Sequence, residues 1–498
     1  MLETIKGVRN EAPFYYFEQI SKIPRASSNE GKIAEYLCNF AKERNLECYR
    51  DEYNNVLITK EATKGRENEE CLMLQAHTDM VAEKNVSTVH DFENDPIKLV
   101  VEGNILRAEG TTLGADDGFG VAIMLAVLDN KVLSHMRLEC LFTSSEEIGL
   151  VGAGKFDYSK IKSKRMINLD SAEENTVIIG CCGGVRTEVT MPVVRQSVDL
   201  DGYKITIGGL QGGHSGEDID KKRLNSHKLM GKILRDFKGN TKIRVGEING
   251  GDKDNAIPRE CSLTLVPDSY MECENVLSKI NEKIRKEIRA KEDNGLFVNV
   301  EKVKISSVIS YEDTDKLLKC LLTPNGVLCY RSKEPFIPQT SRNLARIRTK
   351  ENEIKIGFSS RSYLDTQLEC SMKELEALAK SVGADVYHHE RYPGWASDKD
   401  SDLVRNWQSA YKKATGKETN PTLIHAGLEC GLISSEIDKF TAISVGANVH
   451  DLHTPKETME LDSLDRIYDT IIEMLSLTDL SFQDKWVRFP QGKITLTR

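Results

Sequence analysis

Short apolar runs and one long apolar stretch alternate along the first part of the chain. Runs typical of buried strands stand at residues 71–76, 138–143 and 166–169. Between the first two runs, residues 118–128 (GFGVAIMLAVL) are almost wholly apolar, which predicts a buried helix. Strands that alternate with buried helices are typical of a mainly parallel sheet covered on both faces. We therefore predict an α/β fold whose chemistry lies at the carboxyl ends of the strands.

The pattern changes near residue 186 and returns to the earlier style beyond Pro393. Alternating strands such as 203–207 and amphipathic helices such as 224–237 occupy the intervening segment. A second set of strands and helices, which we expect to include a strand at 298–305, begins near Leu296. This arrangement indicates a parent domain interrupted by an inserted domain of two similar α+β lobes. The expected boundaries are 1–185 plus 391–498 for the parent domain and 186–390 for the inserted domain.

Histidine and acidic residues follow each of the three predicted strands. His77 and Asp79 come directly after the first strand, Glu146 and Glu147 after the second, and Asp170 after the third. An extended backbone places His77 and Asp79 on one face, so that one could bind a metal ion while the other orients it. Each of these residues alone would be interpreted as a solvated loop residue. Their recurrence at the same end of one sheet favours a metal site.

A further acidic pair, Asp116 and Asp117, lies in the glycine-punctuated segment GTTLGADDGFG, just before the apolar helix. Adjacent carboxylates repel each other unless a cation lies beside them. The segment is not a phosphate-binding loop, because the GxxxxGK[ST] pattern is absent. Carboxylates with imidazole and without thiolates suit Zn²⁺, Mn²⁺ or Co²⁺.

Two later segments offer the additional histidine that a two-metal site needs. GANVHDLHTPKE contains His450 and His453, and HAGLECG contains His425 and Glu429. His425 and Glu429 are four positions apart, so we expect them on one helix face. We take His453 as the preferred ligand, and His425 as either substrate-side or structural.

The predicted inserted domain carries three more candidates. His214 lies in the glycine-rich segment GGLQGGHSGEDI, Asn255 precedes an Ala-Ile-Pro, and Arg361 lies in GFSSRSYLD. An imidazole and an amide could stabilise an oxyanion, and an arginine could bind a carboxylate in bidentate fashion. Taken singly, Arg361 would be an ordinary surface arginine.

Charge and composition narrow the class of protein. The formal net charge is −9 over 498 residues and no long run of Lys or Arg is present, which argues against nucleic acid and membrane surfaces as partners. Without a signal peptide or a continuous membrane-spanning apolar run, we expect a cytoplasmic protein. The 12 cysteines include no CxxC pair, so we expect mostly reduced core residues, and we have no functional interpretation of the adjacent Cys181 and Cys182.

Several motifs, taken in order along the chain, resemble those of the M20 metallopeptidase family, and most closely its aminoacyl-histidine dipeptidase branch. The motifs are HTDMV, GTTLGADDG, TSSEEIGLVGA, NLDSAEE, GGHSGEDI, NAIPRE, HAGLECGL and HTPKE. They run from residue 77 to residue 457, so the resemblance covers most of the chain. It implies a zinc-peptidase catalytic domain with a mainly parallel sheet, interrupted by a lid domain of two ferredoxin-like lobes.

The resemblance also implies a set of metal ligands. Two zinc ions, for which Co²⁺ or Mn²⁺ could substitute, would be bridged by Asp116. One ion would also be held by His77 and Asp170, and the other by Glu147 and His453. A cis peptide bond is expected between Asp116 and Asp117. Asp117 stands where many relatives have Asn, and Thr454 where many have Ser, but neither change removes a ligand.

Roles for the other candidates follow from the same resemblance. Glu146 would be the general base, and Asp79 would orient His77. His214, Asn255 and Arg361 would meet the tetrahedral intermediate and the terminal carboxylate of the substrate. The implied activity is hydrolysis of dipeptides, including Xaa-His.

Other functions remain open from the sequence. An N-deacylase or a tripeptidase could use the same metal centre, and a non-catalytic scaffold could bind peptides through the lid. Retention of Glu146 and of every expected ligand counts against a scaffold. The chain could be a monomer or a homodimer joined through the lid.

Overall fold

The computed structural model describes residues 2–286, 288, 291–330 and 337–477. The chain divides into two compact units. Of the described residues, the first unit comprises those up to Gly180, Trp395–Leu423 and those from Leu428 onward, and the second comprises those of Cys181–Gly394 and Ile424–Gly427. These boundaries differ by a few residues from those expected, and the sequence pattern does not indicate that residues 424–427 join the second unit.

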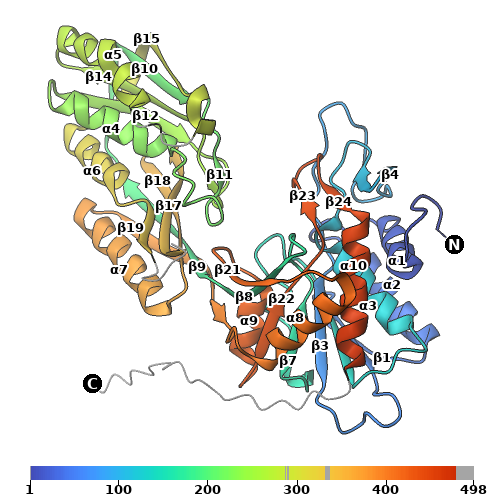
Figure 1. The fold of residues 1–498 in the computed structure, drawn as a ribbon. Coiled ribbons are helices and arrows are strands. Elements are labelled where there is room, and N and C mark those ends of the chain that lie inside the picture. Colours follow the sequence, from blue (N-terminus) through green and yellow to red (C-terminus); the bar gives the residue numbers. More distant parts are fainter. Residues whose placement is uncertain (1, 287, 289–290, 331–336, 478–498) are drawn as a thin grey trace, which may run out of the picture. The chain divides into compact units, whose positions relative to one another are not determined.

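A nine-stranded sheet forms the centre of the first unit (Figure 1). In spatial order its strands are β1 (Glu47–Arg50), β2 (Val56–Lys60), β6 (Leu138–Thr143), β3 (Leu72–His77), β7 (Arg165–Asn168), β22 (Thr441–Ser444), β8 (Thr176–Cys181) and β20 (Trp395–Ala396), with β21 (Asn420–Ile424) paired to β8. The pairs β6–β3, β3–β7 and β7–β22 are parallel. Pairing toward the edges is antiparallel at β1–β2, β2–β6 and β22–β8. The four central strands are therefore parallel, as predicted, but the sheet as a whole is mixed, because pairing toward both edges is antiparallel.

Side chains alternate between the two faces of this sheet. Leu72, Leu74 and Ala76 of β3 belong to the large apolar core, whereas Gln75 and His77 point to the other face. The core is closed by α1 (Glu11–Ser21), α2 (Gly31–Glu43), α3 (Ala115–Asp129), α8 (Asp402–Thr415) and α10 (Leu461–Ser476). Helix α3 contains the predicted apolar stretch and is buried almost throughout, which confirms that prediction.

Smaller elements complete the first unit. A four-stranded sheet has the order β23 (Val449–His450), β24 (Thr458–Glu460), β5 (Ile105–Ala108) and β4 (Leu99–Glu102). The unit also contains α9 (Glu429–Glu436) and the 3₁₀ turn η1 (Tyr158–Lys160). The loop between β23 and β24 carries His453.

The second unit contains a nine-stranded antiparallel sheet built from two lobes of the same topology. The first lobe runs β10 (Arg195–Gly208), α4 (Ser226–Lys238), β12 (Ile243–Gly250), β14 (Cys261–Pro267), α5 (Tyr270–Arg285) and β15 (Phe297–Ile309). Its spatial strand order is β15-β10-β14-β12, which is the fourth, first, third and second strand of a ferredoxin-like lobe.

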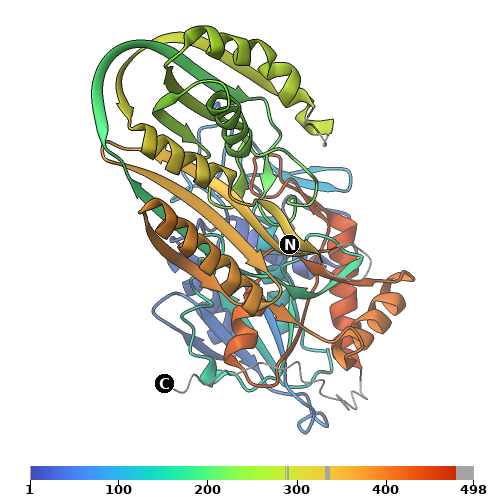
Figure 2. The ribbon, with the colours of Figure 1, turned by 90° about the vertical axis from the view of Figure 1, so that its left-hand side faces the viewer.

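The second lobe repeats this order with different strands. It runs β9 (Gly183–Pro192), α6 (Tyr311–Leu322), β17 (Pro338–Thr349), β18 (Glu353–Ser362), α7 (Asp365–Val382) and β19 (Asp385–Tyr392), and β16 (Gly326–Tyr330) pairs with β17. Its spatial order is β19-β9-β18-β17. Pairing of β12 with β17 joins the two lobes into one sheet, and the four helices lie on one face of it (Figures 1 and 2).

One expectation about these lobes is wrong. The strand expected at 298–305 is part of β15, which closes the first lobe and does not open the second. The second lobe begins at β9, so the first lobe is inserted between its first strand and its first helix. Apolar alternation marks a strand but does not identify its partner, which here is β10 along twelve paired positions.

Several helices of both units begin at residues with hydrogen-bonding side chains. These caps are Asn225 of α4, Ser269 of α5, Ser310 of α6 and Ser401 of α8, each of which accepts a backbone N–H of the first turn. Short elements near the first lobe are β11 (Gly213–His214), β13 (Ala256–Ile257) and η2 (Lys291–Gly295). Among the described residues, no helix is both long and apolar enough to span a membrane. None of the 12 cysteines, all of which lie among the described residues, is in a disulfide bond, and seven are buried.

Candidate metal centre

Three neighbouring strands bring the predicted ligands to one edge of the first unit's sheet. His77 is the last residue of β3, Glu146 and Glu147 lie just beyond β6, and Asp170 lies two residues beyond β7. In parallel strands these ends meet, so residues far apart in sequence become neighbours. The ligand atoms of three groups lie within 4.8 Å of one another: His77–Glu146–Glu147, His77–Asp116–Asp170 and Asp116–Glu147–His453.

Asp116 lies between the two histidines of the cluster. Its Oδ1 is 3.0 Å from Nε2 of His77, and its Oδ2 is 3.1 Å from Nε2 of His453. His77 Nε2 is 3.8 Å from Oδ1 of Asp170, and His453 Nε2 is 3.0 Å from Oε1 of Glu147. One carboxylate is thus shared by two sets of nitrogen and oxygen donors.

The electrostatics of this cluster favour the binding of a cation. Burial raises the pKa of Glu146 well above its usual range, and the nearby carboxylates of Glu147 and Asp170 raise it further. Burial and the charge of Asp116 likewise raise the pKa of Asp170. Burial also acts against ionisation of Asp116, but hydrogen bonds with His453 and His77 outweigh it and lower that pKa. Buried like charges are costly unless a cation compensates them, so this donor set suits divalent metal ions.

Asp79 supports the cluster from behind His77. Its Oδ1 is 3.4 Å from Nδ1 of His77 and accepts the backbone N–H of Glu146 over 2.9 Å. Its Oδ2 accepts the hydroxyl of Ser27 and the backbone N–H of Glu147. Burial opposes ionisation, but the hydrogen bonds from His77 and the backbone leave the pKa of Asp79 below its usual value. The predicted orienting residue therefore also holds the loop that carries the two glutamates.

The segment around Asp116 has an unusual backbone. Gly114 adopts a left-handed conformation with φ of 69°, and Asp116 and Asp117 have non-helical angles within the first turn of α3. The peptide bond between Asp116 and Asp117 is cis, which confirms the expectation from the resemblance. Asp117 turns away from the ligand atoms and accepts the backbone N–H groups of Gly120 and His77.

Two residues that contact this segment were not indicated by the sequence reasoning. The carboxylate of Glu457 accepts backbone N–H groups of the segment Leu113–Asp116. The buried guanidinium of Arg25 donates to the carbonyl oxygens of Gly114, Thr78 and Asp79. The only sequence signal was the position of Glu457 in the motif HTPKE and of Arg25 in a Pro-Arg dipeptide near the N-terminus.

A buried polar network lies on the α9 face of the sheet. Oε2 of Glu429 accepts Nε2 of Gln75 over 2.6 Å and the hydroxyl of Thr143 over 2.7 Å. Nδ2 of Asn168 donates to Oε1 of Gln75 over 2.7 Å. Burial raises the pKa of Glu429 to about 7. The network links β6, β3 and β7 close to the strand ends at which Glu146, His77 and Asp170 lie.

The expectation that His425 and Glu429 share a helix face is wrong. Helix α9 begins at Glu429, and its N-cap Leu428 has an extended backbone, so His425 lies outside the helix. His425 belongs to the second unit, where its Nε2 is 2.8 Å from Oγ of Ser341. Spacing of four positions implies a shared face only when the helix covers both positions.

The second unit gathers a separate polar cluster. Nη2 of Arg361 lies 3.3 Å from Nε2 of His214, and Nη1 donates to the hydroxyl of Tyr392. Asn255 is exposed beside β13, and its carbonyl accepts the backbone N–H of Ser215 over 2.8 Å. His214 and Asn255 are therefore neighbours through the β11–β13 pair. Arg361 is buried, so it is not the ordinary surface arginine that its sequence context alone would suggest.

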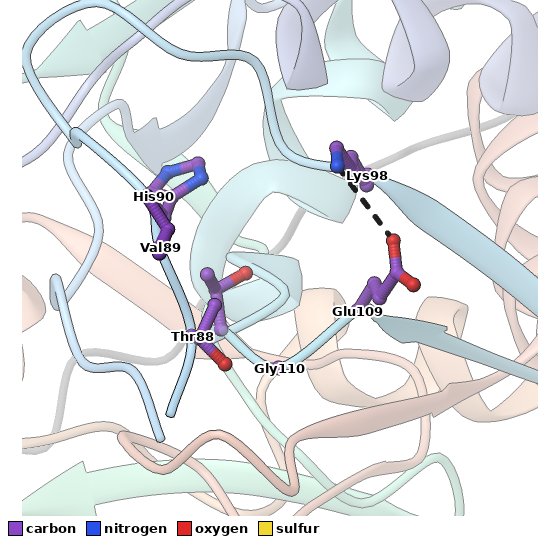
Figure 3. A pocket seen from close by; sticks show the side chains of 7 residues that line it. Thr88, Val89, His90, Lys98, Glu109 and Gly110 are labelled. Carbon is purple, nitrogen blue, oxygen red and sulfur yellow. Dashed lines mark ion pairs between the residues drawn. The ribbon is translucent and has the colours of Figure 1, made fainter. Parts of the chain in front are cut away.

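A hollow of 270 Å³ in the first unit is lined by none of these residues (Figure 3). Its lining includes Thr88, His90 and an ion pair of 3.8 Å between Lys98 and Glu109. None of the groups of possible metal ligands found among the described residues lies in its lining. The metal-ligand cluster remains the candidate site.

Comparisons with known proteins identify the family of the chain. The model of peptidase family M20/M25/M40 matches residues 73–476. The cytosol non-specific dipeptidase of Escherichia coli (strain K12) is 33% identical over 464 residues, which cover 92% of this chain and 96% of that protein. The crystal structure of aminoacylhistidine dipeptidase from Vibrio alginolyticus matches with a TM-score of 0.80 at 32% identity, over 95% of this chain and 98% of that chain.

A more distant likeness concerns the fold alone. The crystal structure of a tripeptidase from Staphylococcus aureus matches with a TM-score of 0.54 at 16% identity, over 94% of this chain and 98% of that chain. The family match covers most of the chain, and a relative above 30% identity covers nearly all of it. The chain therefore belongs to peptidase family M20, a family of metallopeptidases, and is a hydrolase.

Proposed function

We propose that the protein is a cytosolic two-metal dipeptidase that hydrolyses dipeptides, including Xaa-His. The observation that carries the proposal is the position of Asp116 between two donor groups that each include one histidine. The similarity to a cytosol non-specific dipeptidase and to an aminoacylhistidine dipeptidase supports the substrate class and the compartment.

The donor atoms fit two divalent cations. His77, Asp116 and Asp170 would hold one, and Asp116, Glu147 and His453 the other. Nitrogen and carboxylate donors without thiolates suit Zn²⁺, with Co²⁺ or Mn²⁺ as substitutes. When bound, such cations lower the pKa of water and polarise a carbonyl group.

Glu146 is the proposed general base. It lies within the ligand cluster but belongs to neither of the two proposed metal-ligand sets, and burial together with the neighbouring carboxylates raises its pKa. It takes a proton from the attacking water and delivers that proton to the leaving amine. Asp79 contacts the Glu146 backbone and the His77 ring, so it fixes the position of the proposed base relative to the proposed metal ligand.

For the second unit we propose substrate binding, as the lid of the catalytic unit. Arg361 binds the terminal carboxylate of the dipeptide, because its guanidinium offers parallel donors. His214 and Asn255 stabilise the oxyanion of the tetrahedral intermediate. The carbonyl oxygen of His425 and the guanidinium of Arg361 both lie close to Gly216. We therefore propose that His425 lines the substrate side of this cluster.

The test is release of free amino acids from matched substrates. The panel contains Xaa-His dipeptides, Ala-Ala, tripeptides and N-acetyl amino acids, each with added Zn²⁺ and with a chelator. Chelator-sensitive cleavage of dipeptides supports the proposal. Cleavage of acetylated substrates alone indicates a deacylase, cleavage of tripeptides alone a tripeptidase, and no cleavage by a metal-loaded protein a peptide-binding scaffold.

Assembly is a separate question that the same preparation answers. We propose either a monomer or a homodimer joined through the second unit, which has exposed sheet edges. Light scattering after size-exclusion chromatography distinguishes the two states by mass.

A further inference from the structure

Glu457 has an environment that a loop glutamate rarely has. It lies between His453 and β24, and its side chain is only 2% exposed. Its Oε2 accepts the N–H groups of Leu113 (2.8 Å) and Gly114 (3.0 Å), and its Oε1 accepts those of Ala115 (2.8 Å) and Asp116 (3.3 Å). One buried carboxylate therefore satisfies four consecutive backbone donors.

The segment 113–116 depends on such an acceptor. Its N–H groups precede the regular part of α3, because the helical angles are interrupted at Asp116 and Asp117. The first N–H groups of a helix have no partner within the helix and favour a negative charge nearby. From the other side, Arg25 donates to the carbonyl of Gly114, and a side chain at Gly114 would clash with Arg25. The carboxylate of Glu457 thus binds the backbone N–H groups of this loop, and the guanidinium of Arg25 binds its carbonyl oxygen at Gly114.

The same stretch of chain carries a ligand. His453 lies four residues before Glu457, and its Nε2 is 3.1 Å from Oδ2 of Asp116. Glu457 binds the backbone of Asp116 while His453 contacts its side chain. The segment 453–457 therefore contacts Asp116 at two points, its backbone and its carboxylate. A displacement of this shared carboxylate would change both proposed metal-ligand sets at once.

We propose that Glu457 is a positioning residue that fixes the shared ligand Asp116, and thereby sets the affinity of both metal positions. The inference rests on the proposed two-metal function. A carboxylate that merely stabilised the start of α3 would lower the stability of the variant without changing metal affinity. The two roles are therefore separated by measuring metal binding directly.

The experiment uses Glu457→Gln in the full chain. The glutamine side chain has the same volume, but its amide nitrogen replaces one carboxylate oxygen. A hydrogen-bond donor then faces two backbone N–H groups. Loss of such an outer hydrogen-bond partner typically weakens metal binding by about 10–100-fold. We expect the Zn²⁺ dissociation constants of both positions, measured by competition with a chromophoric chelator, to rise by this factor. Saturating Zn²⁺ should restore most of kcat with little change in KM.

Glu460→Gln is the matched control. Glu460 lies three residues further on and accepts Asn448 Nδ2 and, at 3.0 Å, His450 Nε2, so it does not contact the Asp116 loop. Its substitution should leave the Zn²⁺ dissociation constants unchanged. The absorption spectrum of the Co²⁺-loaded protein gives a second readout, because a displaced ligand alters the d–d bands of Glu457→Gln but not those of the control.

The outcomes separate this inference from the proposed function. Wild-type protein that binds no divalent cation overturns both. Wild-type protein that binds two cations, with unchanged dissociation constants and Co²⁺ spectrum in Glu457→Gln, overturns only the role of Glu457. If Glu457→Gln does not fold, as judged by circular dichroism, Glu457→Asp is measured in the same way, since its shorter side chain keeps the charge but cannot reach all four donors. Unchanged metal affinity in that variant is equally decisive against the proposal.

Discussion

The backbone N–H of Glu146 donates to Oδ1 of Asp79 over 2.9 Å. The same carboxylate lies against the Nδ1 edge of the His77 ring. One buried acid therefore sets the place of both the proposed general base and a proposed metal ligand. Because Glu146 is held through its backbone, its side chain can be changed without moving the loop.

We expect Glu146→Gln to keep both metal ions and to lose about 10²–10⁴-fold in kcat, because general base catalysis contributes this much. The measurement combines steady-state kinetics with metal analysis. Glu436→Gln, on the exposed side of α9, is a control that should retain full activity. Near-normal turnover in Glu146→Gln would exclude this residue as the base.

We expect His214→Ala to lower kcat by about 10²–10³-fold, as is found when one donor to an oxyanion is removed. Its metal content should equal that of the wild type, because His214 lies in the second unit and the ligand cluster in the first. His388→Ala, in the same unit, serves as the control. A change confined to KM would make His214 a residue that binds the ground state.

We expect Arg361→Lys to raise KM for dipeptides by about 10–100-fold, since hydrogen bonds to charged groups contribute about 1.5–3 kcal/mol. Lysine keeps the charge but loses the paired donors. The comparison substrate is a dipeptide with an amidated C-terminus, for which wild type and variant should differ little. An equal loss on both substrates would contradict carboxylate binding by Arg361.

Removal of metal should destabilise the protein. The cluster holds several buried carboxylates whose charges repel each other, and bound cations relieve this repulsion. At a free Zn²⁺ concentration about 100 times the dissociation constant, binding adds about 2.7 kcal/mol to the free energy of unfolding. Calorimetry should show a higher Tm with Zn²⁺ than with chelator. His453→Ala should show a smaller difference, and equal Tm values for the wild type in both conditions would speak against a metal site.

Acid should destabilise the protein through His227. This imidazole is fully buried, its Nδ1 is 3.2 Å from the carbonyl oxygen of Leu344, and burial lowers its pKa from 6.5 to about 4. The contribution to stability is complete above pH 6.5 and is lost as the pH falls from 6.5 through about 4, because only the unfolded chain takes up the proton readily. At about 1.36 kcal/mol per unit, the total is about 3 kcal/mol.

The check is urea unfolding of wild type and His227→Asn across this range of pH. Asparagine can still donate to the carbonyl of Leu344 but does not titrate. The difference in unfolding free energy between the two proteins should shrink as the pH falls and should be constant above about pH 7. A constant difference at every pH would show that His227 does not contribute to acid sensitivity.

Local sequence patterns were sufficient to predict the strands that carry the proposed ligands. The apolar runs before His77, Glu146 and Asp170 are short and bounded, and their parallel pairing follows from the buried helix between the first two. Because the carboxyl ends of parallel strands meet at one edge, the sequence alone placed these three residues together. The roles of the individual residues stay predictions until the variants are measured.

Partners that depend on distant contacts could not be derived in this way. Glu457 binds N–H groups 341 to 344 positions earlier in the chain, β15 pairs with β10 and closes the first lobe, and His425 and Glu429 lie in different units. Periodicity reports which face of an element is buried, but not what covers it. The sequence by itself determined the α/β fold class and the acidic strand ends, because these follow from local patterns. Only the tertiary structure decided which carboxylate holds the Asp116 loop, because that choice depends on long-range packing that brings backbone donors and a buried acceptor within hydrogen-bonding distance.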